Sequence, residues 1–94
     1  MIRSVLWTPK AEETFDLVIN IIQNSWGDIA AGKFIKITYN KINLIKHQPY
    51  LYKASISKNI RQVIVTKQTS MFYEVTGDYI VILFFMDNRQ EPLI

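Results

Sequence analysis

The chain has 94 residues, of which 49% are hydrophobic, and a formal net charge of +3. This composition fits one small domain with a buried core and excludes an intrinsically disordered chain. It contains no cysteine, which excludes disulfides, thiolate metal sites and cysteine nucleophiles and indicates a reducing compartment. The first residues lack the apolar segment of a signal peptide, and the longest apolar run, residues 79–86, is too short to cross a bilayer. We expect a soluble cytoplasmic protein.

The N-terminal part is predicted to form a short strand followed by a helix. Residues 2–7 make a short apolar segment. Thr8 can cap the following helix, and Pro9 suits its first position, where no backbone donor is missed. The helix is expected to run to about Ser25. Its apolar stripe is predicted to comprise Ala11, Phe15, Val18 and Ile22, widened by Leu17 and Ile21.

A second helix is predicted directly after the first. Gly27 is expected to end the first helix, and Asp28 to cap the second, which runs over residues 29–46 and is stopped by Pro49. A break this short between two amphipathic helices predicts an antiparallel helical hairpin, which can cover one face of a sheet. The inner side of the second helix is predicted to carry Ala30, Phe34, Ile37, Ile45 and either Lys41 or Ile42.

The C-terminal part is predicted to form three consecutive strands. They cover residues 60–66, 69–75 and 79–86, and Gly77 supplies the tight turn before the last of them. The last strand is apolar at every position, so it is central or covered on both faces. Residues 48–59 form a connection, within which a short extended piece is possible at residues 51–55. The order β-α-α-β-β-β predicts an α+β domain with a helical hairpin packed on a mostly antiparallel twisted sheet.

Charge is distributed unevenly along the chain. Residues 29–73 contain eight basic residues and no acidic one, whereas the acids lie in the first helix, at Asp28 and from Glu74 onward. A basic middle favours an anionic partner, either nucleic acid or an acidic protein segment. The alternative is that these lysines only keep the second helix soluble.

Short motifs spread over nearly the whole chain resemble the RelE/ParE superfamily of bacterial type II toxins. They occur in the family's order: VLWTPKA at residues 5–11, Leu44 and Pro49 at the end of the second helix, Ile60-Arg61 opening the last three strands, FYEVTGD at residues 72–78 for the pattern Y-x-V-x-G-D, and NRQEP at residues 88–92 for the pattern R-Q-x-P. An unrelated small α+β domain is the alternative.

The resemblance implies a toxin that is held inactive by a cognate antitoxin protein. The antitoxin is expected to lay an acidic amphipathic segment over the helices and the sheet. RelE-like members cleave mRNA in the ribosomal A site, and ParE-like members inhibit DNA gyrase, so both are candidate targets. A free toxin of either kind would arrest growth. No cofactor, metal ion or membrane is expected.

Metal-independent cleavage of RNA through its 2′-hydroxyl requires a base, an acid and cations that stabilise the phosphate. The resemblance makes Arg61 and Arg89 candidate catalytic arginines, because the family places arginines at the start of this strand and after the last one. Lys53 and Lys58 are further candidates, in the loop where RelE-like enzymes carry lysines. The alternative for all four is a solvated side chain or, for Arg89, an ion pair with a neighbouring acid.

The chain also departs from the nuclease pattern. Ser70 stands where RelE-like nucleases carry a further arginine, and residues 92–94 supply neither histidine nor tyrosine. Tyr73 is expected in the core, and His47, the only histidine, is expected to be structural at the negative end of its helix. A general base and acid are therefore not identified. Three functions stay open: an mRNA endoribonuclease, a protein inhibitor of a topoisomerase, and an antitoxin-binding module without toxicity.

Overall fold

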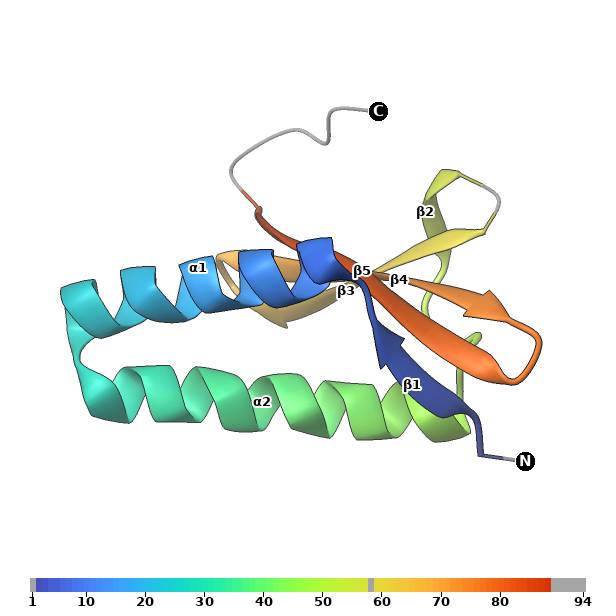
Figure 1. Cartoon of the computed structure of the whole chain (residues 1–94), viewed down its shortest axis with the longest axis horizontal. Helices are drawn as coiled ribbons and strands as arrows, with labels where there is room; N and C mark the ends of the chain where they lie inside the picture. Colours follow the sequence, from blue (N-terminus) through green and yellow to red (C-terminus); the bar gives the residue numbers. More distant parts are fainter. Residues whose placement is uncertain (1, 58, 89–94) are drawn as a thin grey trace.

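The computed structural model describes residues 2–57 and 59–88, with the backbone alone at residues 55–57. One strand precedes two helices, and four strands follow them (Figure 1). The elements are β1 (Ser4–Trp7), α1 (Pro9–Trp26), α2 (Asp28–His47), β2 (Ala54–Ser57), β3 (Ile60–Thr66), β4 (Thr69–Thr76) and β5 (Tyr79–Asp87). The α+β class and the helical hairpin are confirmed. The short strand β2 is additional, and it begins inside the piece predicted to be extended.

The strands form one sheet in the order β1-β5-β4-β3-β2. Strand β1 pairs with β5 in parallel, with Trp7 opposite Ile82, and the other neighbours are antiparallel. The sheet is thus mostly antiparallel, as predicted. Strand β5 lies between β1 and β4, and this inner position explains why it is apolar throughout.

Local contacts fix both ends of α1. The hydroxyl of Thr8 accepts a hydrogen bond from the amide of Ala11 (2.9 Å) and donates one to the carbonyl of Leu83 (2.8 Å), so the helix cap is also tied to β5. At the other end Gly27 has a φ of 93°, which allows the chain to turn into α2. The prediction that Asp28 caps α2 is wrong. Gly27 takes the capping position, and the Asp28 carboxylate accepts a hydrogen bond from Gln23 Nε2 (2.6 Å) instead.

The two helices cover one face of the sheet, and the core lies between the layers (Figure 1). Aromatic rings join three elements near its centre. The ring of Phe15 on α1 lies 5.1 Å from that of Trp7 on β1 and 5.0 Å from that of Phe85 on β5. The cluster of buried residues comprises Ala11, Phe15, Phe34, Ile42, Ile45, Val63, Val65, Met71, Tyr73, Ile80, Ile82 and Phe85.

The predicted inner side of α2 is partly wrong. Phe34, Ile42 and Ile45 are buried as expected, but Ile37 is 37% exposed. Ala31 is buried in place of Ala30, and so is Thr38, whose hydroxyl donates to the carbonyl of Phe34 (2.9 Å). A threonine hydroxyl that is hydrogen-bonded within its own helix can be buried at little cost. A search for apolar residues at helical spacing therefore does not detect Thr38 as an inner residue.

The predicted widening of the α1 stripe is also wrong. Leu17 and Ile21 are 58% and 56% exposed and belong to the outer surface of the helix. Neither helix in the described part of the chain has the length and apolar character needed to span a membrane.

Candidate functional site

Arg61 lies near the start of β3, on the helix side of the sheet, because it stands opposite the buried Tyr73 in register. Its Nη1 donates a hydrogen bond to the carbonyl of Tyr52, and its guanidinium lies 4.9 Å from the centre of the Tyr50 ring. A planar guanidinium suits such a contact with an aromatic face. Arg61 therefore joins the connection after α2 to the sheet.

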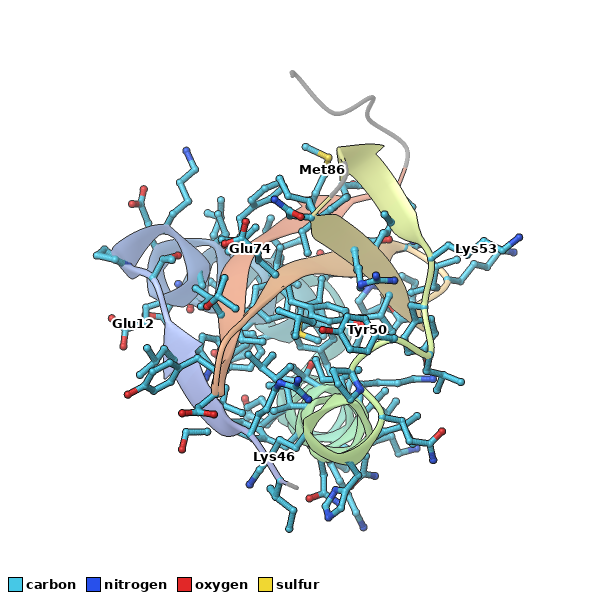
Figure 2. The ribbon with its side chains drawn as sticks, turned by 90° about the vertical axis from the view of Figure 1, so that its right-hand side faces the viewer. Glu12, Lys46, Tyr50, Lys53, Glu74 and Met86 are labelled. Atoms are coloured by element: carbon cyan, nitrogen blue, oxygen red, sulfur yellow. The ribbon has the colours of Figure 1, made fainter. Side chains whose placement is uncertain are left out.

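The Tyr50 ring carries a second cation. Arg3, just before β1, lies 5.7 Å from the ring centre, and its Nε donates to the carbonyl of Gly77 (3.1 Å). Tyr50 is 60% exposed, and Figure 2 shows it above the C-terminal end of α2. Two guanidinium groups thus lie on one aromatic ring at this end of the molecule.

Tyr73 holds the same connection to the core through a hydrogen bond. Its side chain is fully buried, and its hydroxyl donates to the carbonyl of Pro49 (2.8 Å). Burial raises the pKa of Tyr73 to about 12, against the opposing effect of the nearby Arg61 charge. The phenol therefore stays protonated and acts as a hydrogen-bond donor in the core, as expected. This environment does not suit a general acid or base.

A basic groove of about 510 Å³ lies beside β3, between α2 and the connection that leads into β2. It is lined by Lys41, Tyr52, Lys53, Ala54, Gln62 and Ile64. Two lysines from different elements, Lys41 on α2 and Lys53 in the connection, give it positive charge. Such a groove can attract a phosphate backbone or an acidic segment.

The sheet face that points away from the helices has a different character. In register, Gln62, Phe72 and Phe84 form one row across β3, β4 and β5, and the two phenylalanine rings stack at 4.6 Å. In the next row Ser70, only 1% exposed, accepts from Gln62 Nε2 (2.9 Å) and donates to Asn88 Oδ1. Within strands β3 to β5 as described, this face holds no lysine, arginine or histidine; its residues are Ile60, Gln62, Ile64, Ser70, Phe72, Glu74, Thr76, Tyr79, Val81, Phe84 and Met86.

His47 ends α2, and its Nδ1 lies 2.9 Å from the carbonyl of Asn43. It is exposed at the negative end of the helix, where the sequence places it. Within residues 2–57 and 59–88 no group of three or more histidine, aspartate or glutamate side chains is arranged to hold a metal ion.

Comparison with known proteins identifies the fold. No protein-family model matches the chain, and no curated protein does. A solved structure described as the chromosomal ParDE toxin–antitoxin system of P. aeruginosa superimposes with a TM-score of 0.78 at 19% identity, covering 92% of this chain and 96% of that one. The chain has the RelE/ParE-like fold.

Two further structures have the same fold. A YoeB/ParE toxin from Agrobacterium tumefaciens has a TM-score of 0.70 at 11% identity, covering 90% of this chain and 98% of its own. The E. coli DinJ-YafQ toxin–antitoxin complex gives 0.63 at 9% identity, with coverages of 95% and 96%. At these identities the likeness establishes the fold, and site residues have to be argued from the chain itself.

The RelE/ParE-like fold brings together only some of the candidate residues. Lys53 lines the basic groove, while Arg61 lies next to it but is held by Tyr52 and Tyr50. Lys58 and Arg89 lie outside the described residues. Sequence reasoning did not single out Lys41 or Arg3 as site residues. Their placement depends on packing between elements distant in sequence, and the signal available was only that Lys41 belongs to the basic middle of the chain.

Proposed function

We propose that this chain is the toxin of a type II toxin–antitoxin system, which arrests growth when its antitoxin is absent. The proposal is supported by the RelE/ParE-like fold, by motifs of that superfamily in the same order along the chain, and by structural likeness over nearly the full length of several such toxins. The toxin would act in the cytoplasm, where both candidate targets lie.

Of the two targets, we favour inhibition of DNA gyrase without cleavage of nucleic acid. This choice rests on the burial and the hydrogen bonds of the Ser70 side chain. Ser70 occupies the position at which RelE-like nucleases are expected to carry an arginine. Its side chain is almost fully buried, and its hydroxyl is hydrogen-bonded to Gln62 and Asn88. On strands β3 to β5 as described, the surrounding face carries neither a lysine or arginine for a phosphate nor a histidine for proton transfer. Lys41 and Lys53, which line the groove beside Gln62, come from α2 and the connection.

Ribosome-dependent cleavage of mRNA is the second candidate, and the basic groove favours it. Lys41 and Lys53 line a groove large enough for part of a nucleotide chain, next to Arg61. Arg89 and Lys58, outside the described residues, would have to complete the chemistry. A module that binds antitoxin but has lost toxicity is the third possibility, and growth on expression distinguishes it.

The antitoxin is proposed to bind across the helical hairpin through an acidic amphipathic segment. A largely apolar groove of about 300 Å³ opens between the hairpin end and the β3–β4 turn. Trp26 and Ile29 at the hairpin end are strongly exposed, at 73% and 79%, and Lys33 lines the groove beside them. Exposed apolar side chains flanked by lysines complement an acidic amphipathic partner.

Induced expression without antitoxin tests the proposal. Growth, mRNA 5′ ends and plasmid supercoiling are followed in one culture, and purified protein is added to a gyrase supercoiling reaction. Arrest with altered supercoiling and intact messages is expected. Arrest with new cleavages inside translated messages would replace the gyrase target by the ribosome, and normal growth would exclude toxicity.

A further inference from the structure

A third pocket lies where α1 and α2 meet the end of β1, apart from the basic groove and from the apolar groove at the hairpin end. It has a volume of about 420 Å³ and is lined by Trp7, Glu12, Phe15, Asp16 and Tyr39. Figure 2 shows Glu12 on the opposite side of the molecule from Lys53, so this pocket is separate from the basic groove.

Three aromatic rings from three elements form its wall. The ring of Trp7 lies 5.1 Å from that of Phe15 and 6.1 Å from that of Tyr39, and Phe15 and Tyr39 meet edge to face at 6.3 Å. Phe15 is buried, whereas Tyr39 is 52% exposed and forms the outer side. Aromatic faces carry partial negative charge, so a ring cluster open to solvent attracts a cation.

Two carboxylates stand at its rim. Glu12 and Asp16 are four residues apart on α1, so they project from the same side of the helix. Both are exposed, and among the residues described neither carboxylate forms an ion pair. Their charges repel each other, and a cation placed between them removes that repulsion. The pocket therefore concentrates negative charge in a chain whose net charge is +3.

We infer that this pocket binds the cationic side chain, an arginine or a lysine, of the antitoxin segment that covers the helices. The identity of the partner rests on the proposed function, whereas the chemistry of the pocket does not. The pocket has ample room for a long side chain, whose charged end would meet the carboxylates while its stem packs on the rings. The antitoxin would then be acidic where it faces α2 but would carry a basic anchor where it passes β1.

The pocket is tested with a minimal probe, N-acetyl-arginine methylamide, and with its neutral analogue N-acetyl-citrulline methylamide. Binding is followed through the indole N–H resonance of Trp7, in a Trp26→Phe background that leaves one tryptophan. We expect a saturable shift with the arginine compound that weakens with salt, and none with citrulline. The double variant Glu12→Gln/Asp16→Asn should weaken binding by about fivefold.

Glu13→Gln is the matched control, because it removes one charge from the same helix turn at a residue that does not line the pocket. Equal shifts from both compounds, or equal weakening by the control, would overturn the inference. Neutralisation by the protein encoded next to this gene is then compared between the same variants. Unchanged rescue of growth would overturn the antitoxin as the occupant. Toxicity is not read in the probe assay, so its outcome is independent of the proposed function.

Discussion

The hydroxyl of Ser70 donates a hydrogen bond to the side-chain oxygen of Asn88, which joins the start of β4 to the residue after β5. The Asn88 amide group donates in turn to the carbonyls of Thr66 (3.3 Å) and Lys67 (3.1 Å), and its backbone amide donates to Gln68 (2.8 Å). One side chain thus holds the β3–β4 turn against the end of β5. It fixes the point from which the chain continues toward Arg89.

Replacing Ser70 by arginine, the residue expected in RelE-like nucleases, should therefore destabilise the protein and not create cleavage activity. The site is 1% exposed and both hydrogen-bond partners of Ser70 would be displaced. We expect a loss of at least about 2 kcal/mol in the free energy of unfolding, measured in urea. Ser70→Ala, which keeps the volume, should lose only about 1 kcal/mol. An arginine variant as stable as the parent would contradict this account.

Arg61 is expected to stabilise the fold, in addition to any contact it makes with a target. Arg61→Lys keeps the charge but loses the planar contact with Tyr50 and the geometry of the bond to Tyr52. We expect the free energy of unfolding to fall by about 1 kcal/mol. Lys53→Gln, in the same region but with no such bond among the described residues, should leave the thermal midpoint unchanged. A midpoint that moves equally in both variants would show that Arg61 has no special structural role.

The raised pKa of Tyr73 predicts that the free energy of unfolding depends on pH in the alkaline range. Its pKa is raised to about 12 in the folded chain from an ordinary value of 10.0. The unfolded chain therefore loses its phenol proton first, and the stabilisation present below pH 10 is lost as the pH rises toward 12. The difference in free energy of unfolding between the parent and Tyr73→Phe should shrink over that range, by about 1.4 kcal/mol per pH unit at most. If the difference in free energy of unfolding stayed constant between about pH 9 and 12, this ionisation of Tyr73 would be ruled out.

Two glycines should respond to alanine with opposite signs. Gly27 has a φ of 93°, which strains any residue with a Cβ, and Gly27→Ala should cost about 1 kcal/mol. Gly32 lies within α2 with open space around its Cα, and Gly32→Ala should stabilise by about 0.5–1 kcal/mol. Denaturant unfolding of the two variants checks both values. Equal changes would mean that the turn between the helices does not limit stability.

The order of the elements could be predicted because local signals mark their ends. Pro9, Gly27 and Pro49 bound the two helices, and Gly77 marks the last turn. Strand β2 could not be predicted from alternation, because it is held only by two paired positions at the edge of the sheet. The prediction that Asp28 caps the second helix was wrong because the side-chain amide of Gln23 bonds to its carboxylate.

The candidate site was less predictable than the fold. Arg61 could be placed on its strand, but its partners Tyr50 and Tyr52 belong to an irregular connection whose path is set by the sheet it packs on. The pairing of Lys41 with Lys53 in one groove likewise arises only when α2 lies beside β3. Such contacts depend on side-chain packing between distant segments, and no periodicity in the sequence encodes them.

The parallel pairing of β1 with β5 has a consequence for the order in which the sheet forms during synthesis. Thr8, directly after β1, bonds to Leu83, a partner 75 positions later in the chain. During synthesis the first strand therefore has no neighbour until the last one has been made, and closure of the sheet is a late, long-range event. A translation product that stops before β5 would leave β1 and the aromatic core unassembled. Premature termination would then yield a fragment that lacks the partner strand of β1 and cannot complete the sheet.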